Sequence, residues 1–230
     1  QLFAKAKTEK DPNVQIKLLT KVISKSPRMA DAYHYRADAY LNLGKNKLAL
    51  SDYSRTVSLR PKDPFRYYAR GLAYQKMGSF SLAQADFSKA ISLKPAYRNF
   101  YLARARVNAS LEKYEDSLRD YQRYLGKRKP SAELSKEMIP VYLGAYRYDQ
   151  AKQLLARLSE AGDDSADLYF WTGRIYSIQN RLDEAVSAYS KAINRDASHA
   201  QAYRYRASAF KDMGDKPAAL EDYTVLLKLQ

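Results

Sequence analysis

The sequence predicts an all-α protein in which a helical hairpin is repeated along the chain. Three observations lead to this fold class. The sequence is self-similar at a period of 34 residues, each period holds two segments with apolar side chains at helical spacing, and glycines or prolines mark many of the breaks between segments. Such a period is typical of helical-repeat solenoids. Apolar residues at i, i+3 or i+4, and i+7 favour amphipathic helices.

The repeats are placed by aligning the sequence with itself. The segment that starts at Ala30 aligns with the segment that starts at Pro64, and the same offset of 34 residues then holds without insertion or deletion. We therefore expect a partial repeat at residues 1–29, followed by one continuous domain of six repeats. The six repeats span residues 30–63, 64–97, 98–131, 132–165, 166–199 and 200–230.

The two ends of the chain carry parts of the same pattern. In the partial repeat, residues 16–27 match a second helix that ends at Pro27, after a truncated first helix at about residues 1–9. At the other end the sequence stops inside a second helix at Gln230, without a polar terminal helix. Because the chain also starts at Gln1 rather than at a methionine, we expect it to be a fragment.

Several positions, numbered from 1 within each repeat, keep the same kind of side chain. Positions 4, 11 and 24 are aromatic in most repeats, and positions 8 and 20 are mostly small. Small residues let neighbouring helices approach closely, and rings fill the space around them. Gly44, Gly78 and Gly214 fall between the two helices of a repeat, where a left-handed residue commonly ends a helix.

These residues, at this period, resemble the tetratricopeptide repeat, and the resemblance covers residues 30–230. It implies a helix–turn–helix in each repeat and a right-handed superhelix whose first helices line a concave groove. In that family positions 2, 5, 9 and 12 face the groove. The resemblance therefore implies partner-binding residues at or beside these positions, namely His34, Phe65, Tyr68, Leu72, Asn99, Arg106, Phe170, Trp171, Arg174 and Arg204. Aromatic anchors mixed with arginines suit an extended or helical peptide.

Two charged positions vary together. Position 7 is arginine in four repeats, and position 23 is aspartate in the same four. The other two repeats lose both charges, with Met138 and Leu154 in one and Thr172 and Ala188 in the other. Because an unpaired buried charge costs about 3–5 kcal/mol, joint loss predicts a partly buried, bidentate pair rather than arginines that reach for a ligand. The predicted pairs are Arg36–Asp52, Arg70–Asp86, Arg104–Asp120 and Arg206–Asp222.

The fourth repeat departs most from the pattern. Ser135 stands at the first aromatic position, and Pro140 lies in the middle of a first helix. Proline removes a helical hydrogen bond, so we expect a kink there. The kink is either a tolerated irregularity or a change of curvature that separates two binding surfaces.

Charge is distributed unevenly along the chain. Residues 1–131 carry 27 basic and 11 acidic side chains, a net charge of +16, whereas residues 132–230 have a net charge of −1. The densest basic patch consists of Arg119, Arg123, Lys127, Arg128 and Lys129. Such a cluster is often only a solvated helix end favoured by the helix dipole. Spread over several repeats, the imbalance predicts a positive field that draws acidic partners.

Composition excludes several classes of function. The chain has no cysteine, which excludes disulfides, thiolate catalysis and cysteine-bound zinc, and only His34 and His199 could supply imidazole to a metal. No apolar run approaches the roughly 18–20 residues of a membrane-spanning helix. Glycine-rich phosphate loops, the HExxH motif and nucleophile turns are absent. We therefore predict that the protein is not an enzyme and needs neither metal nor cofactor.

The leading hypothesis is a non-catalytic scaffold or adaptor that binds a peptide or partner protein in the concave groove, with acidic partners favoured by the basic N-terminal half. A chaperone carboxylate clamp is not expected, because no window of three repeats carries the lysine, asparagine and arginine pattern of that subclass. One alternative is a module that binds a polyanion: nucleic acid, an acidic polysaccharide or an anionic membrane surface. Another is a self-assembling oligomer that pairs through uncovered terminal repeats. The absence of cysteine, which suits both oxidising and reducing compartments, together with the start at Gln1 leads us to favour the bacterial cell envelope as the location, with the cytoplasm as the alternative.

Overall fold

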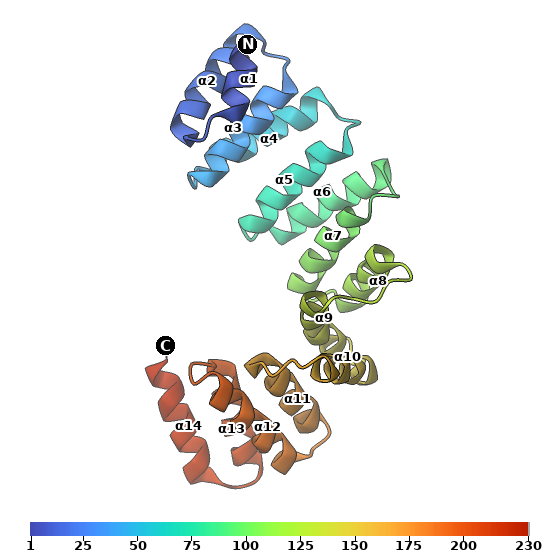
Figure 1. The fold of residues 1–230 in the computed structure, drawn as a ribbon, viewed down its shortest axis with the longest axis vertical. Coiled ribbons are helices and arrows are strands. Elements are labelled where there is room, and N and C mark those ends of the chain that lie inside the picture. The colour runs from blue at the N-terminus through green and yellow to red at the C-terminus, as the bar shows by residue number, and fades with distance from the viewer. Residues whose placement is uncertain (230) are drawn as a thin grey trace. The chain divides into compact units, whose positions relative to one another are not determined.

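The computed structural model describes residues 1–229, which form fourteen α-helices joined by short turns (Figure 1). The helices of the first four hairpins are α1 Leu2–Thr8, α2 Pro12–Lys25, α3 Ala30–Asn42, α4 Asn46–Leu59, α5 Pro64–Lys76, α6 Phe80–Leu93, α7 Arg98–Ser110 and α8 Tyr114–Leu125. Those of the last three hairpins are α9 Ala132–Gly144, α10 Tyr148–Glu160, α11 Ala166–Ile178, α12 Leu182–Arg195, α13 Ala200–Asp212 and α14 Lys216–Lys228. The expected helical position of Gln230 lies outside the described residues.

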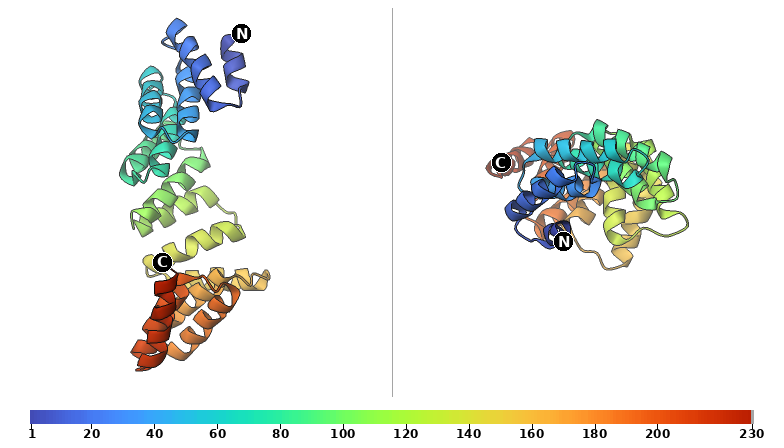
Figure 2. Two further views of the ribbon diagram at one scale, coloured as in Figure 1. Left: turned by 90° about the vertical axis from the view of Figure 1, so that its left-hand side faces the viewer. Right: turned by 90° about the horizontal axis from the view of Figure 1, so that it is seen from above.

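Each predicted repeat is a helical hairpin. Its first helix starts at the first residue of the repeat in all six cases, from Ala30 in the first repeat to Ala200 in the sixth. The two helices of a repeat pack against each other (Figure 2). Within each compact unit a second helix also packs against the first helix of the next repeat, as α4 does on α5 and α12 on α13. The all-α fold, with helices packed in consecutive pairs at the 34-residue period, is therefore confirmed.

Contacts between Cα atoms divide the chain into two compact units. The first unit spans Gln1–Arg128 and holds α1 to α8, and the second begins at Lys129 and holds α9 to α14. Each unit is described by itself below. That all six repeats form one continuous domain stays a prediction.

The N-terminal hairpin, α1 and α2, shows where the predicted helix boundary was wrong. The second helix begins at Pro12, earlier than the predicted start at residue 16. Asp11 explains the early start, because its carboxylate accepts a hydrogen bond from the backbone N–H of Asn13 at 2.8 Å. Pro12 suits the first turn, where its missing N–H leaves no bond unmade. The helix ends at Lys25, two residues before Pro27.

The turn inside each hairpin of the six repeats depends on one residue in the left-handed conformation. Glycine takes this role, as predicted, at Gly44, Gly78 and Gly214, with φ of 68°, 72° and 84°. In the other three repeats the equivalent residues are Glu112, Tyr146 and Asn180, with φ of 57°, 58° and 58°. A side chain raises the energy of this conformation. The hairpin geometry thus persists where the sequence supplies no glycine.

Close packing of small residues against rings forms the core between the helices. Phe87 in α6 and Tyr189 in α12 are both fully buried, and each ring lies over a glycine of the preceding helix, Gly71 and Gly173 respectively. Position 20 is buried in every repeat, from Ala49 to Ala219, with Ser117 in place of alanine in the third. The predicted pairing of small residues with aromatic rings is therefore confirmed.

The four predicted arginine–aspartate pairs are formed, and each is bidentate. Arg36 Nε and Nη2 donate to the two carboxylate oxygens of Asp52 at 2.7 and 2.8 Å, and the other three pairs repeat this geometry at 2.7–2.8 Å. The four aspartates are only 2–6% exposed. In three of the four pairs aromatic rings at positions 4 and 11 flank the guanidinium, as Tyr33 and Tyr40 flank Arg36 at 5.6 and 5.8 Å. Arg104 has one such ring, that of Tyr101, because Asn108 stands at position 11.

A hydroxyl group from the preceding repeat completes each pair. This partner was not predicted from the sequence. The third guanidinium nitrogen, Nη1, donates to Thr20 from Arg36, to Ser54 from Arg70, to Ser88 from Arg104 and to Ser190 from Arg206, at 2.8–3.3 Å. All four hydroxyl residues stand at position 25 of the repeat before the arginine. We call this set of hydroxyl, arginine and aspartate the clamp. Each clamp ties two consecutive repeats together.

The fourth repeat replaces its clamp with apolar side chains. Met138 and Leu154 stand where arginine and aspartate are found elsewhere, and they are 4% and 5% exposed. Pro140 lies inside α9, which continues as an α-helix to Gly144. The predicted kink at Pro140 stays a prediction.

Candidate functional site

The face built by the first helices of the first unit carries a groove of about 840 Å³. Its walls come from α1, α3, α4 and α5, and they include the predicted residues His34, Phe65, Tyr68 and Leu72. A smaller hollow of about 260 Å³ adjoins it, lined by Tyr68 and Leu72 together with Asn99 and Arg106 of α7. Because the two hollows share residues, six of the predicted partner-binding side chains line one continuous surface.

Aromatic rings form the wall of this groove at the junction of the second and third repeats. Phe65 is 40% exposed and contacts the rings of Tyr97 and Phe100, with centroids 5.2 and 5.6 Å away. Tyr68 packs on the same Phe100 ring at 5.0 Å. Phe100 is fully buried, so it fixes the other rings in place. Burial, with a smaller contribution from Tyr97, raises the pKa of Tyr68.

Lys94 and Tyr97, which precede α7, also contact the wall of the groove and were not predicted from the sequence. The ammonium group of Lys94 lies 5.0 Å from the ring centroid of Phe65 and 5.5 Å from that of Tyr97. Both residues come just before the third repeat, outside the helix positions that face the groove in the resembled family. Their short distance in sequence from the groove-facing residue Asn99 was the signal that could have found them.

Carboxylates in the groove already have partners within the protein. Arg66 donates from Nη2 to Asp31 at 2.5 Å and from Nε to Asp63 at 3.0 Å. Asp38 accepts the hydroxyl proton of Tyr53, and burial, together with this bond, raises the pKa of Tyr53 well above its ordinary value. The Nε2 atom of His34 lies 3.6 Å from Asp38 Oδ2. The Nδ1 atom of His34 is buried and has no hydrogen-bond partner among residues 1–229.

Three lysines around the groove, in contrast, face no carboxylate within the described residues. Within the described residues 1–229, no carboxylate oxygen lies within ion-pair distance of Lys7, Lys76 or Lys94. Lys7 and Lys76 line the larger hollow, and Lys94 covers Phe65. The groove therefore presents exposed apolar side chains beneath a surplus of positive charge.

The predicted residues of the second unit do not form a comparable surface. The prediction that Phe170 contacts a partner is corrected, because its ring is 2% exposed and packs in the core against Trp171 and Tyr205, with centroids 4.8 and 5.7 Å away. Trp171 is half-buried against the same cluster. The guanidinium of Arg174 lies over the ring of Tyr205 at 4.0 Å, and Arg204 is exposed.

Part of the predicted basic patch has a local structural role. Arg128 donates to the carbonyl oxygens of Tyr124 and Leu125 at 2.8 and 3.2 Å, so it closes the C-terminal end of α8. Arg119 is paired with Asp116 at 2.8 Å. The other members, Arg123, Lys127 and Lys129, are exposed, and Lys129 is the first residue of the second unit.

Neither a metal-binding cluster nor a membrane-spanning helix is present within residues 1–229. No group of three or more histidine, aspartate or glutamate side chains could hold a metal ion. None of the helices described here has the length and apolar character that crossing a membrane requires.

The fold defines a helical-repeat protein, and in its first unit the first helices line a groove. Comparison with known families gives the particular class. A family model described as tetratricopeptide repeat matches residues 68–133, 137–200 and 179–230, and a second model, TPR repeat, matches residues 37–78. The chain belongs to the tetratricopeptide repeat family, whose members typically are not catalytic and bind proteins or peptides.

Solved structures are similar in fold at low sequence identity. The C-terminal part of a TPR repeat-containing protein from Cytophaga hutchinsonii is 18% identical, with a TM-score of 0.67 over 95% of this chain and 90% of that chain. PilF from Pseudomonas aeruginosa is 15% identical, with a TM-score of 0.61 over 87% and 91%. YrrB, described as a TPR protein with an unusual peptide-binding site, is 18% identical, with a TM-score of 0.55 over 77% and 92%. No curated protein matches the chain.

Proposed function

We propose that the protein is a non-catalytic scaffold or adaptor module that binds an acidic, partly apolar peptide segment in the groove of its first unit. One observation carries this proposal: Phe65 and Leu72, each 40% exposed, line a groove of about 840 Å³ whose bordering lysines face no carboxylate within residues 1–229. Exposed apolar side chains in a concave surface act as anchors for a partner. Surrounding cations favour partners with negative charge and speed their association.

The arrangement of charge supports an acidic ligand. Asp31 and Asp63 are neutralised by Arg66, and Asp38 accepts from Tyr53, so the carboxylates of the groove are already engaged. A peptide carboxylate that enters meets Lys7, Lys76 and Lys94 instead. Family membership adds support, because tetratricopeptide repeats bind proteins and peptides, and YrrB is described as having a peptide-binding site.

The proposal is tested by selecting peptides from a random 12-residue library displayed on phage, with the full chain as bait. We expect the selected peptides to combine large apolar residues with aspartate or glutamate. Leu72→Asp should weaken their binding at least about tenfold, since it places a charge at an exposed apolar side chain that lines both hollows. Leu82 of α6 is the matched control, because it is 53% exposed and lines neither hollow of the groove. If wild type, Leu72→Asp and Leu82→Asp bound the peptides equally well, the groove would not be the binding site.

The polyanion alternative is separated from the groove by salt. Binding to heparin or to single-stranded DNA should fall steeply with salt concentration and be indifferent to Leu72→Asp. Two of the five basic-patch residues, Arg119 and Arg128, are engaged with Asp116 and with helix carbonyls, which leaves less charge for a polyanion. Strong heparin binding together with no selected peptides would favour the alternative.

Self-association is a second candidate function that one observation favours. Leu220, Tyr223 and Leu227 of α14 are 68%, 38% and 75% exposed, and their spacing places them on one face of the helix. A second copy of the chain could cover this apolar face. Mass in solution should then rise with protein concentration and should stop rising in Leu227→Glu. A mass that stays monomeric at all concentrations would exclude this function.

A further inference from the structure

The fifth repeat lacks all three parts of the clamp. Ala156 replaces the hydroxyl residue at position 25 of the preceding repeat, Thr172 replaces the arginine, and Ala188 replaces the aspartate. Each substitution exchanges a larger side chain for a smaller one. The two tyrosines that would flank the guanidinium, Tyr169 and Tyr176, are nevertheless present.

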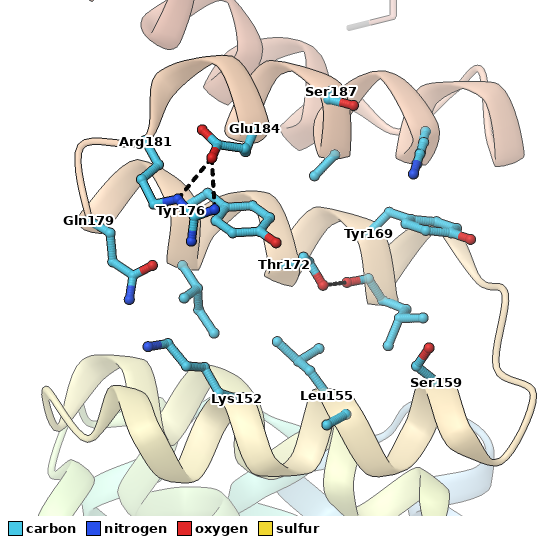
Figure 3. A pocket seen from close by; sticks show the side chains of 15 residues that line it. Lys152, Leu155, Ser159, Tyr169, Thr172, Tyr176, Gln179, Arg181, Glu184 and Ser187 are labelled. Carbon is cyan, nitrogen blue, oxygen red and sulfur yellow. Dashed lines mark hydrogen bonds and ion pairs between the residues drawn. The ribbon is translucent and has the colours of Figure 1, made fainter.

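A cavity of about 640 Å³ lies at this place, between α10, α11 and α12. Ala156, Thr172 and Ala188 all line it, and Tyr169 and Tyr176 form part of its walls (Figure 3). The space therefore includes the volume that an arginine side chain, held by aspartate and hydroxyl, fills in four other repeats. In this respect the fifth repeat differs from the fourth, where the buried side chains of Met138 and Leu154 occupy the clamp positions.

The floor of the cavity is apolar. Leu155, Leu168 and Ile175 line it and are 6%, 6% and 4% exposed. The hydroxyl group of Thr172 donates to the carbonyl oxygen of Leu168 at 2.8 Å (Figure 3). This proton is therefore already engaged in a hydrogen bond within α11. With Ala188 in place of aspartate, the floor has no carboxylate to hold a cation. An apolar group is the occupant that this floor favours.

Positive charge borders the cavity at both ends. Lys152 lies beside Gln179 at one end, and its ammonium group is 3.7 Å from Asp149, whose side chain is 88% exposed (Figure 3). The ammonium group of Lys191 lies 5.8 Å from the ring centroid of Tyr169, at the other end. The remaining charges on the rim cancel, because Arg181 pairs with Glu184 at 2.7 Å. An anionic group at either end of an apolar ligand therefore finds a lysine.

We infer that this cavity is a binding site for a small amphiphile, with an apolar chain on the floor and a carboxylate at a rim lysine. The volume falls within the range of about 300–1,000 Å³ that is usual for small-molecule sites. The lining residues of α11 and of its C-terminal cap run from Leu168 to Gln179, which corresponds to about 16 Å at the helical rise of 1.5 Å per residue. An extended medium-chain fatty acid has the shape and polarity that such a slot requires.

Dodecanoate, below the concentration at which it forms micelles, is the probe for the test. We expect saturable binding in calorimetry and a melting temperature that rises with dodecanoate concentration, because a ligand of the native state stabilises it. N-acetyl-arginine amide, a guanidinium probe, should not bind, since the aspartate is absent. Binding of the guanidinium probe without binding of dodecanoate would overturn the inference. A dissociation constant for dodecanoate weaker than about 1 mM would also overturn it, because a specific site is expected to bind its ligand more tightly than that.

Two variants fill the cavity in different ways. The triple variant Ala156→Ser, Thr172→Arg and Ala188→Asp rebuilds the clamp of the other repeats and should abolish dodecanoate binding while it raises the melting temperature. Ala156→Phe introduces no charge, and Ala156 lies at the exposed edge of the cavity, so the larger side chain should be tolerated. The phenylalanine ring should occupy the cavity and weaken dodecanoate binding at least about tenfold. Unchanged affinity in a folded form of either variant would place the ligand elsewhere.

The anionic part of the inference has its own control. Lys152→Gln and Lys191→Gln, singly and together, should weaken dodecanoate binding but leave the melting temperature of the free protein unchanged, because both side chains are exposed. Lys211→Gln in α13 is the matched control, since Lys211 is exposed and does not line the cavity. If the double variant bound dodecanoate as tightly as Lys211→Gln, the carboxylate would have no role and the inference would fail.

Discussion

Gly71 of α5 lies directly against the ring of Phe87 in α6: a Cβ atom added to Gly71 would be 2.6 Å from Cε1 of that ring. Phe87 is fully buried in the core, so its ring can move aside only if its neighbours move as well. Two effects of an alanine at this position oppose each other. Alanine favours the helix by about 1 kcal/mol over glycine, whereas overpacking of a core costs about 1–3 kcal/mol.

We expect the steric effect to dominate. Gly71→Ala should lower the free energy of unfolding, measured by urea denaturation, by about 1–2 kcal/mol. The second substitution Phe87→Leu should lessen the effect of the alanine, because it removes the ring carbons that the Cβ would meet. An unfolding midpoint that rises in Gly71→Ala would show that the ring can move aside.

The clamp predicts strong coupling between its members. Asp86→Leu alone leaves Arg70 with a side chain only 20% exposed and without its carboxylate, and should cost about 3–5 kcal/mol. The double variant Arg70→Met and Asp86→Leu copies the apolar pair of the fourth repeat and should recover most of that loss, because a well-packed apolar pair can replace a buried ion pair. The double-mutant cycle, measured by urea unfolding, gives the coupling directly. Additive effects of the two substitutions would contradict the paired geometry.

The left-handed turn residues predict opposite effects of two simple substitutions. Glu112 adopts φ of 57° with a side chain, so Glu112→Gly should stabilise the protein by about 0.5–1 kcal/mol. Gly78→Ala should destabilise it by about 1 kcal/mol, although an added Cβ meets no atom within 4 Å, because the backbone conformation alone opposes the change. Melting temperatures of the two variants check both signs. A higher melting temperature for Gly78→Ala would contradict the turn geometry.

Burial of Tyr189 predicts a loss of stability at alkaline pH. Burial raises the pKa of Tyr189 from 10.0 to about 12. The unfolded chain therefore releases this proton at lower pH than the folded chain, so the stabilisation is complete below pH 10 and is lost as pH rises from about 10 to 12. The free energy of unfolding should fall by about 2–3 kcal/mol more in wild type than in Tyr189→Phe over that interval. Parallel pH profiles of the two proteins would contradict the prediction.

Much of the fold could be predicted because the repeat supplies internal comparisons. The 34-residue offset predicted where the first helix of each of the six full repeats begins. The joint loss of charges at positions 7 and 23 predicted bonds such as that of Arg36 with Asp52. The hydroxyl partner was missed, although Thr20 and its equivalents vary with the arginine, because it belongs to the preceding repeat. The early start of α2 was missed because Asp11 and Pro12 begin the helix through local capping, which the periodic pattern does not report.

The site was less predictable, because the period indicates which face a residue lies on but not how far its side chain is buried. Phe170 stands at a groove-facing position, yet its ring packs in the core against Trp171 and Tyr205. The cavity of the fifth repeat was missed for a related reason. The sequence shows that Thr172 and Ala188 are smaller than the residues they replace, but whether neighbouring helices close the gap depends on packing across three helices.

The clamp also bears on where one copy of the unit ends and the next begins. The hydroxyl group of Ser54 belongs to the first repeat, and the arginine and aspartate that use it, Arg70 and Asp86, belong to the second. A repeat that was excised, duplicated or transplanted at its sequence boundary would lose half of one clamp and carry half of another. Recombination among such proteins, whether natural or designed, therefore keeps the hydrogen bond from the arginine to the hydroxyl group only when the new preceding repeat has serine or threonine at position 25. The smallest segment that carries a complete clamp therefore extends from the second helix of one repeat to the second helix of the next.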